Sequence, residues 1–182
     1  MGDYFINISM KTKRLLIRNF KEDDYYDLYE YLSDKEIYRF EPGEPITINT
    51  AKKLCKERAK NNNFLAVQLE NKIIGHIYFG QIKPEKLLTW ETGFIFNRKY
   101  HGKGYATESL RAVIKYGFQN LNIHRITAHC NPKNIPSWKL LERVKMRREG
   151  KMRENIYFND DVNGDPIWLD TYEYGLLKKD LD

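Results

Sequence analysis

Residues 100–108 read Tyr-His-Gly-Lys-Gly-Tyr-Ala-Thr-Glu, and this short stretch decides the fold. It lies between a β-prone run at 89–96 and a segment whose apolar residues repeat at helical spacing up to Phe118. Two glycines let the backbone approach a ligand closely, and residues 101–106 include no Ser, Thr, Asp or Asn to cap the helix. The first N–H groups of this helix therefore need another acceptor. A phosphate or diphosphate beside Lys103 would satisfy them.

Two well-known phosphate-binding patterns do not match this stretch. A Walker loop places Ser or Thr directly after its Gly-Lys pair, whereas Gly104 follows Lys103 here. A dinucleotide fingerprint needs glycine at the position of Thr107. The spacing alone leaves two interpretations open, an anion site and a plain tight turn between a strand and a helix. The missing capping side chain favours the anion site.

Outward from this stretch, expected strands and helices alternate along the chain. Toward the N-terminus we expect a strand at 15–17, helices from Asp23 or Asp24 to Leu32 and from Thr47 or Asn49 to about Ala59, and a hairpin at 64–69 and 73–79. Toward the C-terminus we expect a strand at 125–130, a helix at 134–144 and strands at 149–158 and 167–176. The pattern predicts an α+β domain of three layers, α/β/α, with a mixed, largely antiparallel sheet of about seven strands and about four helices.

The 182 residues are expected to form a single domain over 1–182, because neither a repeat nor a linker divides them. No run approaches the roughly 20 apolar residues of a membrane span, and residues 1–10 lack the pattern of a secretion signal. Cys55 and Cys130 have no Cys or His at metal-ligand spacing. We therefore expect a cytoplasmic protein with no disulfide, no metal site and no contact with a membrane.

The charge is moderately basic, with 31 Lys and Arg against 25 Asp and Glu. Acids and bases are interspersed, so the surplus predicts an attraction to anions without a dedicated basic arm. Nucleic-acid binding through this surplus would weaken steeply with salt. The sequence shows neither a recognition helix nor an RNA-binding motif, so we expect no specific nucleic-acid partner.

The stretch at 100–108 resembles the pyrophosphate loop of the GNAT acyltransferases, which reads Gln/Arg-x-x-Gly-x-Gly/Ala at the start of the central helix. Residues 101–106 match it except at the first position. The longer string Gly-Lys-Gly-Tyr-Ala-Thr-Glu at 102–108 is typical of the branch that contains the ribosomal-protein N-terminal (Rim-type) acetyltransferases. Other segments similar to the family follow in the family's order and cover nearly the whole chain: 14–18, 73–75, 91–96, 131–137 and 170–174.

The resemblance implies a single GNAT-like domain whose sheet splays apart between the strands at 89–96 and 125–130. It also implies an N-acetyltransferase that moves the acetyl group of acetyl-CoA directly to a primary amine, without a metal. The residues that the resemblance assigns to acetyl-CoA binding are the backbone groups of Phe94, Ile95 and Phe96, the loop residues His101, Gly102, Lys103, Gly104, Tyr105, Ala106 and Thr107, and the side chains of Asn131 and Asn134.

Acetyl transfer to an amine requires a neutral amine, stabilisation of an oxyanion and a proton for the departing thiolate. The resemblance gives the last role to Ser137, whose hydroxyl would protonate or orient the thiolate. Glu91 is the candidate general base, and the alternative is that it pairs with a Lys or Arg across the sheet. Asn134 is equally well explained as the N-cap of the next helix, and its two roles can coexist.

Two positions depart from the family pattern. His101 replaces the usual Gln or Arg, so the loop is expected to form through its backbone donors. Lys145 stands where the family has a glycine in a left-handed helix end, which places the local geometry in question.

The alternative function is a binding module or sensor that holds CoA or another anion without turnover. The acceptor amine is also left open among a ribosomal-protein N-terminus, another protein, a polyamine and an antibiotic-like small molecule. The acidic turn at 159–165 favours a cationic acceptor, or is simply a solvated hairpin tip. The expected assembly is a monomer or a homodimer.

Overall fold

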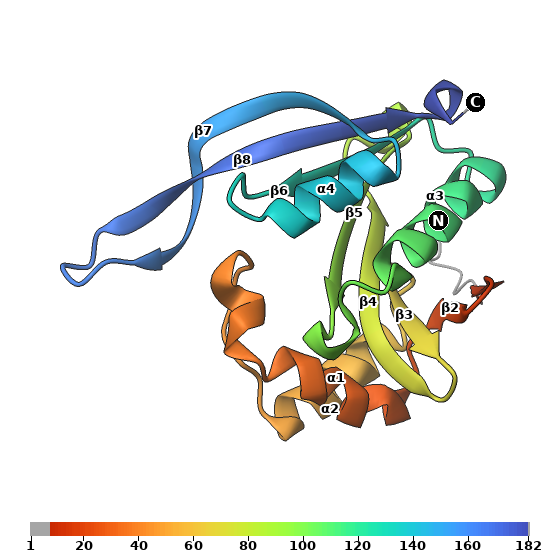
Figure 1. Ribbon diagram of the computed structural model, residues 1–182, viewed down its shortest axis with the longest axis horizontal. Coiled ribbons are helices and arrows are strands. Elements are labelled where there is room, and N and C mark those ends of the chain that lie inside the picture. The colour runs from red at the N-terminus through yellow and green to blue at the C-terminus, as the bar shows by residue number, and fades with distance from the viewer. Residues whose placement is uncertain (1–7, 182) are drawn as a thin grey trace.

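The structure is a computed structural model that describes residues 8–181. One eight-stranded sheet with the order β1-β2-β3-β4-β5-β6-β8-β7 forms its centre (Figure 1). The strands are β1 (Ser9–Lys11), β2 (Leu15–Asn19), β3 (Phe64–Leu69), β4 (Lys72–Gln81), β5 (Thr89–Phe96), β6 (Arg125–Cys130), β7 (Arg147–Asp160) and β8 (Pro166–Leu177). The α-helices are α1 (Tyr25–Leu32), α2 (Ile48–Arg58), α3 (Tyr105–Asn120) and α4 (Ile135–Arg143).

The predicted fold class is confirmed, with four α-helices and a mixed sheet in which only β5 and β6 run parallel among the described strands. The strand count is eight rather than about seven. The additional strand is β1, which pairs with β2 over only three residues. Such a short strand leaves no readable period in the sequence.

Apolar side chains pack on both faces of the sheet and produce the expected three layers. The larger cluster joins the sheet to α3 and α4 and includes Ile77, Leu110, Ile114, Ile126 and Leu141. The smaller cluster joins it to α1 and α2 and includes Phe20, Leu28, Tyr31, Cys55 and Ile73. Each cysteine is a free, buried thiol.

Local chemistry sets the helix starts. The side chain of Thr47 accepts a hydrogen bond from the Thr50 N–H and caps α2. Asp24 precedes α1 but makes no capping hydrogen bond, because its carboxylate pairs with Arg18 at 2.8 Å instead. A five-residue 3-10 turn, η2 (Lys35–Arg39), was not predicted; it follows α1 and leads into the segment at 41–45.

The sheet splays between β5 and β6. Their parallel pairing covers Thr89–Arg125, Trp90–Ile126 and Glu91–Thr127, and then stops although both strands continue. The rest of β5, from Thr92 to Phe96, pairs with β4 on one edge only. The central sheet therefore has an internal gap with an unpaired edge of β5 along it.

The β7–β8 hairpin projects beyond the other strands (Figure 1). At its tip the Asp161 carboxylate accepts hydrogen bonds from the N–H groups of Asn163 and Asp165. These bonds use Asp161 within the turn itself, as expected of a solvated hairpin tip. Across residues 8–181 no helix has the length and apolar character needed to span a bilayer. Residues 1–7, which form most of the segment tested for a secretion signal, lie outside the described residues.

Candidate active site

The start of α3 presents backbone N–H donors that the chain leaves unpaired. Gly102 and Gly104 have φ angles of 75° and 80°, a left-handed conformation that glycine adopts readily. Gly104 is the N-cap and offers no capping side chain, and the first intrahelical bond runs from the Glu108 N–H to the Gly104 carbonyl at 3.0 Å. Among the described residues, the N–H groups of Tyr105, Ala106 and Thr107 have no acceptor. Together with the helix dipole they form a cradle for an anion.

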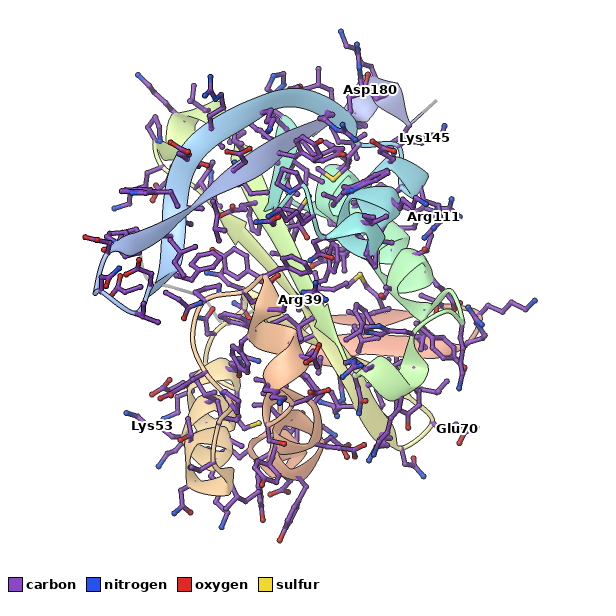
Figure 2. All side chains as sticks on the ribbon, turned by 60° about the vertical axis from the view of Figure 1, so that its left-hand side comes forward. Arg39, Lys53, Glu70, Arg111, Lys145 and Asp180 are labelled. Atoms are coloured by element: carbon purple, nitrogen blue, oxygen red, sulfur yellow. The ribbon has the colours of Figure 1, made fainter. Side chains whose placement is uncertain are left out.

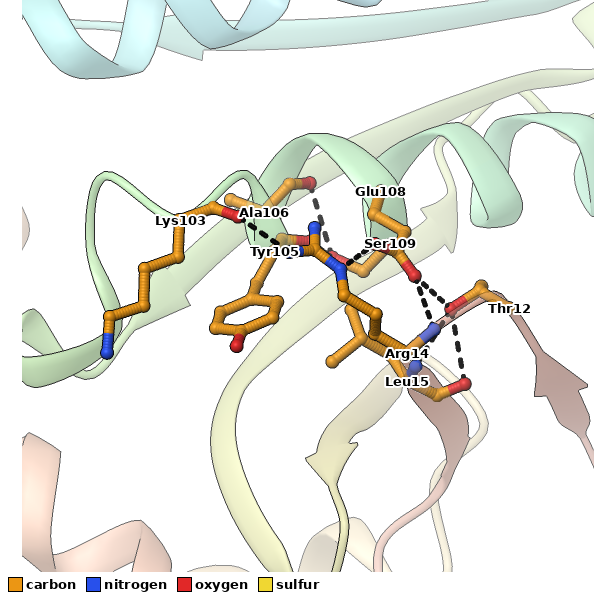
Figure 3. A network of polar contacts seen from close by, with 8 residues as sticks. All are labelled: Thr12, Arg14, Leu15, Lys103, Tyr105, Ala106, Glu108 and Ser109. Atoms are coloured by element: carbon orange, nitrogen blue, oxygen red, sulfur yellow. Dashed lines mark hydrogen bonds and ion pairs between the residues drawn. The ribbon is translucent and has the colours of Figure 1, made fainter.

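A polar network fixes this loop from the side (Figure 3). Glu108 accepts hydrogen bonds from the Arg14 Nε at 2.7 Å and from the Thr12 hydroxyl at 2.6 Å. Arg14 Nη1 donates to the Lys103 carbonyl at 2.9 Å, and the guanidinium lies 4.5 Å from the centroid of the Tyr105 ring. The turn between β1 and β2 thus positions the loop and places a cation next to the unpaired amides.

Side chains of the loop make further contacts with β5 and α4. His101 Nε2 lies 2.9 Å from the Phe96 carbonyl oxygen, so the residue that departs from the family pattern joins the loop to the end of β5. The Thr107 hydroxyl accepts a hydrogen bond from Arg143 Nη1 at 3.3 Å. Lys103 is exposed beside the ring of Tyr100. Three cations, at positions 14, 103 and 143, therefore surround the start of α3.

The unpaired edge of β5 leads to this loop. The Asn97 N–H donates to β4, and the Thr89 carbonyl accepts from Ile82. Because hydrogen bonding alternates along an antiparallel pair, the N–H and C=O groups of Phe94 and Phe96 point into the gap. Those of Ile95 point toward β4. A second extended segment, such as the amide-containing arm of a cofactor, fits this edge.

The beginning of α4 lies across the gap from β5. The Asn134 side chain accepts a hydrogen bond from the Ser137 N–H at 3.3 Å, which confirms its role as the N-cap. Asn131 Oδ1 accepts from the Lys133 N–H at 2.8 Å and leaves its amide nitrogen available. Ser137 lies close enough to the Cys130 thiol to lower its pKa, although burial has the larger effect. Burial raises the pKa of Cys130 to about 11, so this cysteine is a neutral thiol rather than a nucleophile.

Glu91 lies where the pairing of β5 and β6 ends. Its Oε1 atom is 2.9 Å from His129 Nδ1 on β6, so it has a cross-strand partner that is neither the Lys nor the Arg considered from the sequence. The hydrogen bond that His129 donates to the Glu91 carboxylate raises the pKa of His129. The pair bridges the two strands at the origin of the splay.

A pocket of about 220 Å³ opens on the α1–α2 face of β5. It is lined by Glu41, Pro42, Arg58, Phe64, His76, Tyr78, Gly93, Phe94 and Ile95. The last two belong to the segment predicted to hold a thioester. Another pocket, of about 310 Å³, lies at the turn between β1 and β2 and contains none of the predicted site residues.

The polar groups of the β5 pocket differ in how they titrate. Burial lowers the pKa of His76 well below its ordinary value, so this imidazole is neutral and hydrogen-bonds the Tyr31 hydroxyl at 2.8 Å. Burial raises the pKa of Glu41 to about 7. A carboxyl group that changes charge near neutral pH therefore lines this pocket.

The sequence reasoning missed Glu41 and gave it no role in the site. It reaches the pocket because η2 carries the chain from α1 toward β5; Figure 2 labels Arg39, two residues before it. No local pattern distinguishes this glutamate from Glu44 three residues later. Glu41 comes close to β5 only through the packing of the folded chain.

Comparisons with known proteins agree with this geometry. Residues 14–147 match the Acetyltransferase (GNAT) domain family. The chain is 38% identical over 172 residues to the uncharacterized N-acetyltransferase YnaD of Bacillus subtilis (strain 168), covering 93% of this chain and 96% of that protein. It is 26% identical over 162 residues to the ribosomal protein uS5-alanine N-acetyltransferase of Escherichia coli (strain K12), covering 82% and 83%.

A solved structure of a GNAT-family acetyltransferase from Bacillus anthracis superimposes with a TM-score of 0.85 at 36% identity, covering 94% of this chain and 99% of that one. The family match spans most of the chain and includes the loop, the splayed strands and the start of α4. This chain therefore belongs to the GNAT family of acetyl-CoA-dependent N-acetyltransferases.

Proposed function

We propose that this protein transfers the acetyl group of acetyl-CoA to a primary amine, either a protein N-terminal α-amine or the amine of a small molecule. One observation carries the proposal: the unpaired edge of β5 leads directly to the uncapped, cation-flanked start of α3. A diphosphate fits the unpaired amides of Tyr105, Ala106 and Thr107. The amide groups of a pantetheine arm fit the backbone N–H and C=O groups of Phe94 and the N–H of Phe96, whose carbonyl oxygen already contacts His101.

The bound donor supplies an activated thioester, and the chain supplies orientation and proton transfer. The Phe94 N–H is positioned to polarise the thioester carbonyl. As the C–N bond forms and the C–S bond breaks, the Ser137 hydroxyl donates a hydrogen bond or a proton to the sulfur. The side-chain amide of Asn131 is a further contact beside the sulfur.

Two carboxylates near β5 can receive the proton that the amine loses. Glu91 is held by His129, and this pair can take the proton directly or through water. Glu41 lines the pocket itself. An α-amine with a pKa near about 8 needs little help at neutral pH, whereas a lysine amine near about 10.4 needs a strong base.

A thiol-release assay with acetyl-CoA and a panel of α-amino peptides, polyamines and aminoglycosides tests the proposal. Release that depends on one class of amine, and that falls in Ser137→Ala while the CoA dissociation constant stays unchanged, supports it. CoA binding without release for any amine supports the alternative, a binding module. A cytoplasmic location, a monomer or homodimer, and the absence of a specific nucleic-acid or membrane partner remain parts of the proposal.

A further inference from the structure

The β5 pocket contains a cation, Arg58, that forms no ion pair with the described residues. Arg58, the last residue of α2, extends its guanidinium over the Phe64 ring, 4.3 Å from its centroid, and lies 5.4 Å from that of Phe20. Within residues 8–181, its Nη1 is the one buried side-chain nitrogen or oxygen without a hydrogen-bond partner. No described carboxylate forms an ion pair with it.

A buried charged donor without a partner is costly, and folded proteins satisfy nearly all such groups. The aromatic contacts fix the plane of the guanidinium, but they leave its in-plane N–H donors unused. The described chain therefore supplies no acceptor for Nη1, and a ligand in the pocket can supply one. The planar fork of a guanidinium matches a carboxylate, which accepts its hydrogen bonds with two oxygens.

The place of Arg58 connects it with the reaction. The same pocket is lined by Gly93, Phe94 and Ile95, the part of β5 proposed to hold the thioester, and by Glu41. Its volume of about 220 Å³ suits a small group. Arg58 is the only Lys or Arg among the lining residues.

We infer that this pocket is the acceptor subsite and that it takes an amine bearing a carboxylate, which Arg58 binds; the inference rests on the proposed acetyl transfer. The carboxylate lies near the amine, because the thioester segment and Arg58 line one small pocket. A polyamine presents only positive charge to Arg58 and is disfavoured. The carboxylate can belong to a free amino acid or to an acidic first residue of a peptide.

Matched acceptors separate these sources. The first pair is the amidated peptides Glu-Ala-Ala and Gln-Ala-Ala, the second is free glutamine and its α-amide, and spermidine is the cationic reference. Each is assayed by thiol release with the wild type, Arg58→Gln, Arg58→Lys and Lys56→Gln. Lys56 is the matched control, because it is exposed on the same helix. Thermal unfolding and CoA binding are measured for every variant.

The wild type is expected to give a lower KM for the carboxylate member of at least one pair, and that pair identifies the source. Arg58→Gln should raise this KM about 10- to 150-fold, the range of a charged hydrogen bond, and leave the carboxamide member unchanged. Arg58→Lys should restore part of the preference, and Lys56→Gln should behave as the wild type. Equal use of both members, a preference for spermidine, or an equal loss for both members in Arg58→Gln overturns the inference.

A binding measurement keeps the inference separate from the proposed function. If no amine releases thiol, the proposed transfer fails, and calorimetric titration of the same acceptors into CoA-loaded protein decides about the pocket. Binding of the carboxylate members that Arg58→Gln abolishes supports the inference. Binding that is absent, or unaffected by Arg58→Gln, refutes it.

Discussion

Replacing Glu41 with glutamine is expected to change both the pH dependence of acetyl transfer and that of stability. Burial raises the pKa of Glu41 from its ordinary value of 4.5 to about 7. If this carboxylate receives the amine's proton, its ionised fraction is about 0.9 at pH 8 and about 0.1 at pH 6. The wild-type kcat/KM should then fall about tenfold over this range beyond the fall caused by protonation of the acceptor.

The ratio of wild-type to Glu41→Gln kcat/KM removes the titration of the acceptor and of other groups near β5, such as His129, because both proteins share them. Glu44→Gln is the matched control, since this glutamate is exposed in the same turn. Glu91→Gln tests the competing base. A ratio that is flat from pH 6 to 8 refutes the role of Glu41, and a larger loss of kcat/KM in Glu91→Gln than in Glu41→Gln at pH 8 assigns the base to Glu91 instead.

Stability gives an independent readout of the same burial. Between pH 4.5 and 7 the folded protein holds a proton on Glu41 that the unfolded chain has released, so wild-type stability falls as pH rises through this window. The full shift corresponds to about 3 kcal/mol, and solvent at the pocket mouth reduces this to about 1–2 kcal/mol. Denaturant titration should show that the free energy of unfolding of Glu41→Gln, relative to that of the wild type, rises by this amount from pH 4.5 to 8. Parallel stability curves would show that Glu41 is not buried as described.

Three further substitutions, two of them with a control variant, test the geometry. Lys145 has a left-handed φ of 69°, and Lys145→Gly should stabilise the protein by about 1 kcal/mol in denaturant titration, because a side chain is strained there; destabilisation would contradict this. A Cβ on Gly75 would lie 2.6 Å from a carbonyl oxygen of β5, so Gly75→Ala should lower the free energy of unfolding by about 1–3 kcal/mol. A Cβ on Gly93 meets nothing closer than 3.9 Å, so Gly93→Ala should lower it little. Equal losses of stability in the two variants would refute this packing. Arg14→Met should weaken CoA binding about tenfold by calorimetry, because it removes a cation and a hydrogen bond to the loop. Lys13 is the exposed neighbour of Arg14, and Lys13→Met should leave CoA binding unchanged. Equal effects of the two substitutions would show that only net charge matters.

The sequence predicted those parts of the molecule whose signal is local. The apolar stripe of α3 and the lack of a capping side chain before it both lie within a short window, and the structure has the helix at 105–120 with no side-chain cap. Lys145 was identified as a residue that replaces the family's left-handed glycine, which placed the local geometry in question; its backbone is left-handed all the same. The register of β5 and β6 gives the splay that the family resemblance implied.

The sequence could not predict contacts that depend on distant segments. Glu41, Arg58 and Gly93 come from a loop, a helix end and a strand, and only the packing of α1 and α2 on the sheet brings them to one pocket. The alternative to a general base at Glu91 was a cross-strand pair with a Lys or Arg, because opposite charges are common cross-strand partners. The parallel register of β5 and β6 places His129 there instead.

The brief pairing of β5 with β6 has a consequence for cooperativity. Within residues 8–181, hydrogen-bonded strand pairing connects the β1–β5 part of the sheet to the β6–β8 part through only three residue pairs. The two parts can therefore differ in local unfolding free energy, and hydrogen exchange should resolve them as separate units. A molecule that spans the gap binds only when both parts of the sheet are folded. At a free concentration 100 times its dissociation constant, it adds about 2.7 kcal/mol to the stability of each part and makes their opening a single event.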